Sequence, residues 1–364
     1  TVVGGIHATV MPEDVAGHPH VDYVVAGDGE GALVDIVARG RGGDRTAAAR
    51  SGRAEIIRGS PAQDLSALPM PAHDLLDYSK YQFTDPTRGR CNTATVMSSR
   101  GCPFECTFCF HSRQVRYRTI DSFIEEIAYL RDKKDVRYFF VYDDTFTVDR
   151  KRVATIARRL MALGIDGVNF QCQVRANLVD EESAVALRQA NFIRMSMGVE
   201  SGCEEMLKRC SKGITTRQCL DACGILMRAG IEPKASFIIG HPYETRETAR
   251  RTMAFSREMD VLEANFTVMT PYPGTGMYEA ALRGDGIRFA RPEFATQWKV
   301  FRRWGKPIIE TPELSADDLA ALREEAVMEF YTQDKVFAFY RAMFDRGNRS
   351  RYFYRPLNFA WRRK

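Results

Sequence analysis

The chain has 364 residues, an apolar content of 45% and a formal net charge of +5. This length and apolar content are enough for two domains, or for one large barrel with extensions. The net charge is modest for the length and gives no indication of a nucleic-acid partner. No run approaches the ~20 consecutive apolar residues that span a bilayer, and no charged-then-apolar signal segment opens the chain. We therefore expect a cytoplasmic protein without a transmembrane segment.

Nine cysteines are present. In a long chain of cytosolic character, cysteines serve as metal ligands or buried apolar groups more often than as a disulfide framework. The cysteine usage therefore directs attention to metal chemistry.

The first 90 residues suggest part of an α/β domain and a connector. Residues 1–60 contain the strand-like runs "TVVGG" and "DYVVAG" and the helix-like run "GEGALVDIVARG". The chain opens directly on a strand-like run, so we expect the earlier part of this domain to be absent. Residues 61–90 include "LPMPAHDLLD", whose two prolines favour a surface linker.

From residue 93 onward, six β-rich runs alternate with helical segments: "TATVMS", "VRYFFVY", "GVNFQCQ", "IRMSMGV", "KASFIIG" and "ANFTVMT". This alternation predicts a parallel sheet, either barrel-like or doubly wound. Capping-box pairs at Ser122 with Glu125 and at Thr215 with Gln218 predict the starts of two of the helices.

Polar or glycine-rich residues follow all six runs. They are the three cysteines of residues 102–109, "DDTF" (143–146), Arg175 with Asn177, "ESG" (200–202), "GHPYE" (240–244) and "PYPGT" (271–275). A doubly wound sheet concentrates its site at one switch point, whereas a barrel draws on every strand end. We therefore predict an α/β fold with a partial (β/α)6 barrel over residues 91–290, preceded by the Rossmann-like fragment and followed by a helical C-terminal region.

The run "GCPFECTFCF" places Cys102, Cys106 and Cys109 in one short loop. A structural zinc site normally has four protein ligands, and His111 could complete such a set. Three thiolates on a cubane iron-sulfur cluster instead leave one iron without a protein ligand, where a substrate or cofactor can bind. The spacing favours an iron-sulfur cluster over zinc and over unligated structural cysteines.

This loop, with an aromatic residue before its third cysteine, resembles that of the radical S-adenosylmethionine superfamily. The later strand ends add to the resemblance with "DDTF", "GVESG", "FIIGHPYE" and "TPYPGT". The segments "VVGGIHAT", "DYVVAGDGEGALVDIV" and "LPMPAHDLLD" are similar to the end of the cobalamin-binding domain and to the connector found in one large subgroup of that superfamily. The complete domain of that subgroup is longer. The resemblance therefore implies cobalamin for the full-length family and leaves open whether this chain alone binds it.

The resemblance also implies roles for individual residues. Cys102, Cys106 and Cys109 would hold a 4Fe-4S cluster, whose open iron binds the amino and carboxylate groups of S-adenosylmethionine. The residues expected around that cofactor are Phe108 at the adenine, Asp143 or Asp144 at the ammonium group or a substrate hydroxyl, Arg175 at the carboxylate, Glu200 and Ser201 at the ribose, and Gly240 beside the adenine. The residues expected near cobalamin are Gly4, Gly5, His7 and the loop from Gly27 to Glu30. The pattern D-x-H-x-x-G is absent, so His7 is expected to be a loop residue and not a cobalt ligand.

Other interpretations of the same residues stay open at this point. "DDTF" can be a helix-capping turn, Arg175 a structural ion-pair partner, and His241 a turn residue. The remaining cysteines could bind a second cluster or pack in the core: Cys172, Cys203, Cys210, Cys219 and Cys223.

Residues 291–364 are predicted to form a helical C-terminal extension, with a helix that begins after Ser315. Its end, "NRSRYFYRPLNFAWRRK", mixes basic and aromatic residues. Such a mixture can contact RNA or an anionic membrane, but folding back on the barrel is the interpretation we favour.

We therefore expect an enzyme that reductively cleaves S-adenosylmethionine to methionine and a 5′-deoxyadenosyl radical. In the subgroup, this radical abstracts a hydrogen atom and methylcobalamin delivers a methyl group to an unactivated carbon of a small molecule. Expected partners are a small-molecule substrate and a one-electron donor such as flavodoxin or ferredoxin, with no nucleic acid favoured. The alternatives are cyclisation, rearrangement or oxidation without methyl transfer, and a non-catalytic cluster-binding protein. Methylthiolation of transfer RNA would require a second N-terminal cysteine set and a C-terminal RNA-binding barrel, and neither is visible.

Overall fold

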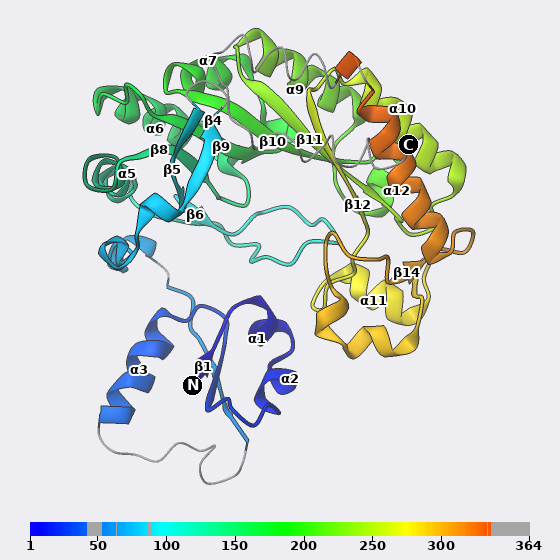
Figure 1. The fold of residues 1–364 in the computed structure, drawn as a ribbon, viewed down its shortest axis with the longest axis horizontal. Helices are drawn as coiled ribbons and strands as arrows, with labels where there is room; N and C mark the ends of the chain where they lie inside the picture. The colour runs from blue at the N-terminus through cyan, green and yellow to red at the C-terminus, as the bar shows by residue number, and fades with distance from the viewer. Residues whose placement is uncertain (42–52, 63, 86–88, 333, 336–364) are drawn as a thin grey trace.

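The computed structural model describes residues 1–41, 53–62, 64–85, 89–332, 334 and 335. Within them, an N-terminal unit, a curled sheet and a C-terminal lobe follow one another along the chain (Figure 1). The basic aromatic tail considered above lies outside the described residues.

The N-terminal unit (residues 1–60) has three layers. Its parallel sheet has the order β1-β2-β3 and consists of β1 (Val2–Val3), β2 (Tyr23–Ala26) and β3 (Glu55–Arg58). Its helices are α1 (Ile6–Val10), α2 (Pro12–Ala16) and α3 (Glu30–Arg41). All four side chains of β2 are buried: Val24 packs with Ala8 and Val15, whereas Tyr23 and Val25 pack with Ala32 and Ile36 of α3. The strand is therefore covered by helices on both faces.

The connector contains three short 3-10 turns and one strand. The turns are Leu65–Ala67, His73–Leu75 and Tyr78–Lys80, and the strand is β4 (Gln82–Asp85). Strand β4 pairs antiparallel with the first barrel strand, so the barrel sheet begins inside the segment expected to be a linker. Asp64 and Asp77 cap two of the turns through Ser66 and Ser79, which gives these short turns local hydrogen-bond partners.

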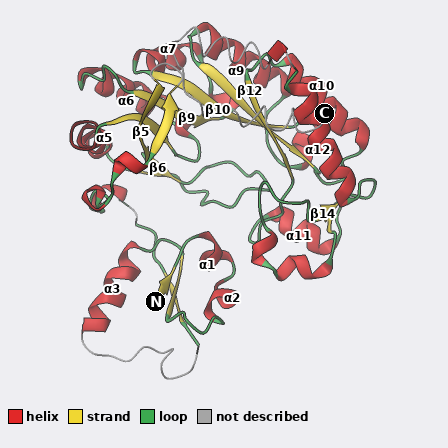
Figure 2. Cartoon of the chain, viewed as in Figure 1, coloured by secondary structure: helices red, strands yellow, loops and turns green. Residues whose placement is uncertain are grey.

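Six parallel strands and β4 form a seven-stranded sheet with the order β12-β11-β10-β9-β8-β5-β4. The parallel strands are β5 (Gly89–Val96), β8 (Val136–Val141), β9 (Asn169–Val174), β10 (Phe192–Glu200), β11 (Glu232–Ile239) and β12 (Glu263–Val268). The helices are α5 (Ile120–Lys134), α6 (Arg150–Ala162), α7 (Glu181–Gln189), α8 (Glu204–Arg209), α9 (Thr216–Arg228) and α10 (Arg246–Glu258). Helices α5, α6, α7, α9 and α10 cover the convex side of the curled sheet (Figure 2). The predicted partial (β/α)6 barrel is confirmed.

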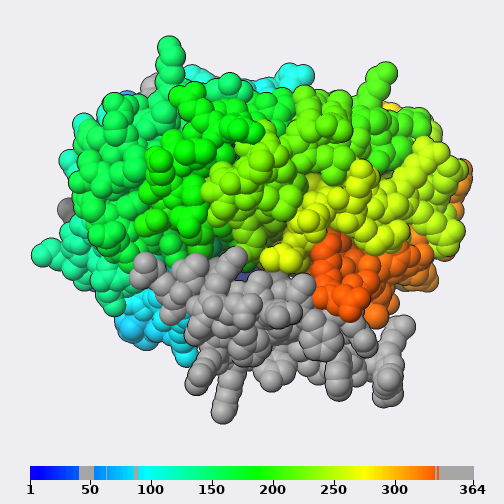
Figure 3. All heavy atoms as spheres, turned by 90° about the horizontal axis from the view of Figure 1, so that it is seen from above, coloured from blue at the N-terminus to red at the C-terminus, as the bar shows by residue number. Residues whose placement is uncertain are grey.

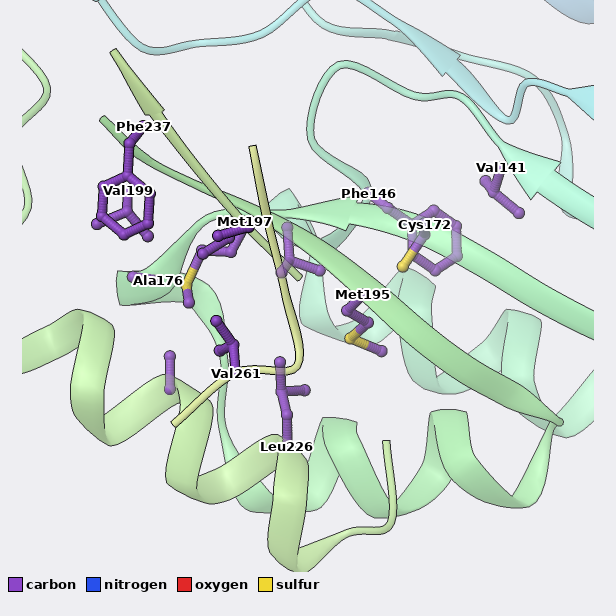
Figure 4. Packing of buried hydrophobic residues seen from close by; sticks show 14 of the residues in the cluster. Val141, Phe146, Cys172, Ala176, Met195, Met197, Val199, Leu226, Phe237 and Val261 are labelled. Atoms are coloured by element: carbon purple, nitrogen blue, oxygen red, sulfur yellow. The ribbon is translucent and has the colours of Figure 1, made fainter. Parts of the chain in front are cut away.

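The core lies between the strands and this helical layer. In Figure 4, Cys172 lies beside the Phe146 ring, while Met195 and Met197 lie between their strand and the helical layer that carries Leu226. The predicted capping box of Thr215 with Gln218 is confirmed at the start of α9. The predicted box of Ser122 with Glu125 is wrong: α5 begins three residues earlier, and Thr119 accepts the hydrogen bond from the Ser122 amide.

The C-terminal lobe follows the sixth strand. It contains α11 (Gly276–Arg283), a hairpin of β13 (Arg288–Phe289) and β14 (Ile309–Glu310), two 3-10 turns (Pro292–Thr296 and Trp298–Val300) and α12 (Ala316–Phe330). Ser315 caps α12 as predicted. Seen from above, the orange end of α12 lies beside the yellow segments of the outer layer (Figure 3). Among the described residues, no helix is both long enough and apolar enough to cross a membrane.

Candidate active site at the strand ends

The three cysteines lie in one loop (residues 101–115, the cysteine loop) that is closed at its stem by two short antiparallel strands. These are β6 (Ser99–Arg100) and β7 (Arg116–Tyr117). Gly101 has a φ of 95°, and a Cβ there would lie 2.3 Å from the Gln114 carbonyl oxygen. Only glycine fits this close approach of the two arms of the loop.

Backbone hydrogen bonds attach the cysteine loop to neighbouring elements. The Thr107 amide donates to the Cys210 carbonyl (3.0 Å), and the Met277 amide donates to the Thr107 carbonyl (2.8 Å). The Cys102 amide donates to the Ser112 carbonyl (2.9 Å). The loop is thus fixed to the residue after α8 and to the start of α11.

Two polar groups lie beside the buried thiols. The Thr145 hydroxyl is 3.4 Å from Cys102 Sγ, and an Arg175 N–H group is 3.6 Å from Cys106 Sγ. Arg175 is buried, stacks over the Phe104 ring at 3.9 Å and also donates to Asn177. The Arg175 guanidinium, as a charged donor, stabilises negative charge on the Cys106 sulfur, which suits a thiolate that ligates a cluster. The Thr145 hydroxyl donates its hydrogen to the Asp144 carbonyl.

The donor set fits the expected iron-sulfur cluster. Cys102 and Cys106 are buried, whereas Cys109 is exposed and lines a cavity together with Phe108. Among the described residues, no three His, Cys, Asp or Glu side chains converge on one point. A cubane does not need such convergence, because each thiolate binds a different iron. His111 contacts the carbonyl of Ser112.

Both carboxylates after β8 hold the stem of the cysteine loop. Asp143 is 1% exposed and accepts hydrogen bonds from the Ser98 amide and from the hydroxyls of Ser98 and Ser99, all at 2.6 Å. Burial raises the pKa of Asp143, although these hydrogen bonds oppose the change. The exposed Asp144 accepts from the Gly101 amide at 2.8 Å. The structure therefore gives both residues a structural role, with Asp144 the more accessible of the two.

After β10, Glu200 forms a buried ion pair with Lys212, whose Nζ lies 2.6 Å from Oε1 of the carboxylate. Burial alone would lower the pKa of Lys212, but the neighbouring Glu200 carboxylate outweighs this effect and raises it. Glu200 has a φ of 70°, in the left-handed region that residues other than glycine rarely adopt, and its side chain lines the cavity described below. Ser201 is fully buried and contacts the Thr252 hydroxyl of α10 at 2.9 Å.

The loop after β11 folds back on a buried carboxylate. Glu244 accepts hydrogen bonds from the amides of Gly240 and His241, while its Oε1 and the His241 Nδ1 have no partner within the described structure. Gly240 has a φ of 92°, and a Cβ there would lie 3.1 Å from Ile309, so this glycine packs against the C-terminal lobe. Burial raises the pKa of Glu244 from 4.5 to about 7 and lowers that of His241.

This raised pKa predicts a pH-dependent stability. The folded state keeps the Glu244 proton up to about pH 7, whereas the unfolded chain releases it near 4.5, so stability falls as pH rises between these values. A difference of about 2.5 between the two pKa values corresponds to about 3 kcal/mol. Urea unfolding of the apoprotein from pH 5 to 8 should show this fall, and Glu244→Gln should remove most of it. The exposed control Glu258→Gln should keep the wild-type profile, and identical profiles for all three proteins would contradict the assignment.

A cavity of about 510 Å³ occupies the concave side of the sheet below the cysteine loop. Side chains of alternating strand positions line it: Gln171, Gln173, Ser196, Lys234, Ser236, Asn265 and Thr267, with Phe140 and Ile238 among the apolar ones. At the N-terminal end of the strands, Arg194, Glu232, Glu263 and Lys234 form a network of ion pairs. The positive and negative charges of this network balance. Arg303 adds an exposed positive charge to the lining of the cavity.

The glycines expected near cobalamin lie at the strand ends of the N-terminal unit. Gly4 and Gly5 follow β1, and at Gly5 (φ 89°) no atom lies within 4 Å of the place that a Cβ would take, so its backbone is accessible. The Gly27 amide, after β2, donates to Thr9 (2.9 Å). His7 was expected in a loop but lies in α1, where its ring stacks on Trp298 at 4.1 Å and its Nε2 contacts Asp14. The carboxylate of Glu30 pairs with Arg100. The glycine backbone suits close approach of a ligand, but the side chains of His7 and Glu30 already have protein partners.

The five cysteines considered for a second cluster pack as apolar groups. Cys172, Cys219 and Cys223 belong to the hydrophobic core, and Cys203 and Cys210 are also buried. Burial raises the pKa of Cys210, Cys219 and Cys223 to about 12.

Sequence reasoning missed several site residues. Lys212 lies twelve positions after Glu200, and nothing in "CSKG" indicates their pairing. The cavity lining had a detectable signal, because polar residues alternate with apolar ones in "NFQCQ", "KASFII" and "NFTV". A parallel strand buried on both faces would be continuously apolar.

Comparisons with known proteins agree with this geometry. The model of the radical SAM superfamily matches residues 96–256. An uncharacterized methyltransferase of Pyrococcus horikoshii, PH0819, is 31% identical over 347 residues, which cover 92% of this chain and 73% of the relative. The anaerobic magnesium-protoporphyrin IX monomethyl ester cyclase of Rubrivivax gelatinosus is 29% identical over 77% of this chain, which spans about half (52%) of that relative's length.

Among solved structures, the methyltransferase TsrM from Kitasatospora setae, with cobalamin and a [4Fe-4S] cluster bound, has the same fold. The TM-score is 0.64 with 19% identity, covering 79% of this chain and 62% of TsrM. The chain therefore belongs to the radical S-adenosylmethionine superfamily, and it is an enzyme of the kind that works with an iron-sulfur cluster and S-adenosylmethionine.

Proposed function

We propose that this enzyme cleaves S-adenosylmethionine at a 4Fe-4S cluster and uses the radical to methylate an unactivated carbon of a small molecule, with cobalamin as second cofactor. The observation that carries the proposal is the position of Cys109 and Phe108. Both line the cavity on the concave side of the sheet, which brings the cysteine loop and the polar strand side chains into one compartment. A radical formed at the loop would therefore face a cavity in which a substrate can be held.

Cys102, Cys106 and Cys109 would hold the cluster, which when bound supplies the electron that cleaves the carbon-sulfur bond. The protein contributes the surroundings. Arg175 places a guanidinium beside the cluster ligand Cys106, where it can also pair with the carboxylate of S-adenosylmethionine. The Phe108 ring, at the cavity wall, is available to the adenine.

Glu200 is the residue that we propose for the ribose hydroxyls. Lys212 contacts one carboxylate oxygen of Glu200 and holds the Glu200 side chain in one orientation. Asp144 is accessible for the ammonium group. Asp143, Ser201 and Gly240 are hydrogen-bonded to other protein groups, so we propose that these three residues position the site.

Methyl transfer is favoured over the other outcomes by two relatives that are named methyltransferases, PH0819 of Pyrococcus horikoshii and a protein of Synechocystis. The N-terminal unit adds the accessible backbone at Gly5 beside the glycine loops of Gly4 and Gly27. Cyclisation without methyl transfer is the second candidate, because another relative is named a cyclase.

Two measurements separate these candidates. Adding hydroxocobalamin to the full chain and following its absorbance on a sizing column should give co-elution; free elution would contradict cobalamin binding by this chain.

Incubating reduced, reconstituted enzyme with S-adenosylmethionine deuterated in the methyl group, together with an extract of small molecules, should place the label in a product. 5′-Deoxyadenosine without labelled product would favour the cyclase candidate.

A further inference from the structure

The acidic loop after β2 contacts the stem of the cysteine loop, although about 70 residues of chain lie between them. Arg116 donates to Asp28 at 2.7 Å, and Arg100 donates to Glu30 at 2.6 Å and to Asp28 at 3.3 Å. We name these four residues the latch. Arg100 and Arg116 are direct cross-strand partners in the β6–β7 pair, so the latch closes on both arms of the stem at once.

The latch is a partly buried network of ion pairs, not an isolated pair at the surface. Arg116 is 7% exposed, and its guanidinium also donates to the Ala62 carbonyl of the connector (2.8 Å). Two arginines and two carboxylates balance in charge. Burial alone would raise the pKa of Asp28, but its bonds to Arg116 and Arg100 hold it below the usual value, and the bond to Arg100 does the same for Glu30. Both carboxylates are therefore ionised at neutral pH.

The same stem is held from the barrel side. Asp143 binds Ser98 and Ser99, and Asp144 binds the Gly101 amide, so residues 98–101 lie between carboxylates of the barrel and carboxylates of the N-terminal unit. A second contact of the N-terminal unit is the stack of His7 on Trp298, which joins it to the C-terminal lobe. The N-terminal unit therefore contacts the rest of the chain on two sides.

We propose that the latch makes the N-terminal unit a structural part of the cluster site: Asp28 and Glu30 hold the stem of the cysteine loop through Arg100 and Arg116. These four are positioning residues, which act on the cysteines through the loop. Because coupling between two sites is reciprocal, a ligand that moves the Gly27–Glu30 loop would alter the cysteine loop, and a cluster bound in that loop would favour the docked N-terminal unit. The inference does not depend on methyl transfer or on the identity of the substrate.

A charge-swap experiment on the full-length apoprotein tests the latch by hydrogen exchange. Arg100→Glu should speed amide exchange of residues 23–31 and 99–117 by about three- to tenfold, because like charges would face one another. Arg100→Glu with Glu30→Arg should return exchange in both segments toward wild type. The control Arg246→Glu breaks a 2.7 Å ion pair of similar exposure between α10 and α12 and should leave both segments unchanged.

A second readout follows the reconstituted protein. Iron release to a chelator should be faster in Arg100→Glu than in wild type and slow again in the double variant. If Arg100→Glu fails to fold, raising salt from 0.05 to 0.5 M on the wild type should accelerate exchange selectively in the two segments, because salt screens partly exposed pairs. Unchanged exchange in the single variant, or a double variant no better than the single one, would overturn the latch. None of these readouts uses S-adenosylmethionine, so they can fail independently of the proposed function.

Discussion

Replacing Cys106 with serine is expected to lower formation of 5′-deoxyadenosine by at least about a thousandfold, that is, by more than about 4 kcal/mol of barrier. The thiol is buried beside the Arg175 guanidinium, and a serine hydroxyl of similar size would keep that contact while ligating iron poorly. Iron and acid-labile sulfide per chain should fall in parallel after anaerobic reconstitution.

The matched control is Cys91→Ser. Cys91 lies on β5 and donates to the Phe83 carbonyl, a hydrogen bond that serine can also make. This variant should retain iron, sulfide and activity. Circular dichroism of both apoproteins should match wild type, which separates loss of the cluster from loss of the fold. An active Cys106→Ser enzyme with a full complement of iron would contradict the ligand assignment.

Replacing Lys212 with methionine is expected to destabilise the apoprotein by about 3 kcal/mol, because a buried carboxylate would lose its partner. Glu200 is 7% exposed and Lys212 8%, so water can replace only part of the lost interaction. The double variant Glu200→Gln with Lys212→Met, which removes both charges, should recover most of the lost stability. Urea unfolding at pH 7.5 measures all three free energies.

Lys208→Met serves as the control, since Lys208 is exposed on α8 and should tolerate the change. The two pair variants also separate stability from function. The double variant should be stable yet bind S-adenosylmethionine weakly, because it lacks the oriented Glu200 carboxylate. A single variant as stable as wild type, or a double variant that binds the cofactor normally, would contradict the proposed role of the pair.

Much of the fold follows from local patterns in the sequence. The six runs that alternate with helical segments became the six parallel strands, because hydrophobic period and turn residues act over a few positions. The cap at Thr215 was readable for the same reason, whereas at α5 two candidate caps lie three residues apart and Thr119, not Ser122, took the role.

The site was less predictable, because its contacts join distant segments. The sequence located the cysteines and the strand ends, but Asp143 turns inward to Ser98 and Ser99 across 45 and 44 positions. The bond of Arg116 to Asp28 spans 88 positions. No local period encodes such pairings, and they become visible only once the sheet order brings the loops together.

The central claim is that this chain generates a 5′-deoxyadenosyl radical at the cysteine loop. The most direct test is chromatographic quantification of 5′-deoxyadenosine after anaerobic reconstitution with iron and sulfide, reduction, and addition of S-adenosylmethionine. We predict 5′-deoxyadenosine formed in step with methionine, and none in the Cys106→Ser variant. Full cluster content without any 5′-deoxyadenosine, or zinc without acid-labile sulfide in the purified protein, would contradict the claim.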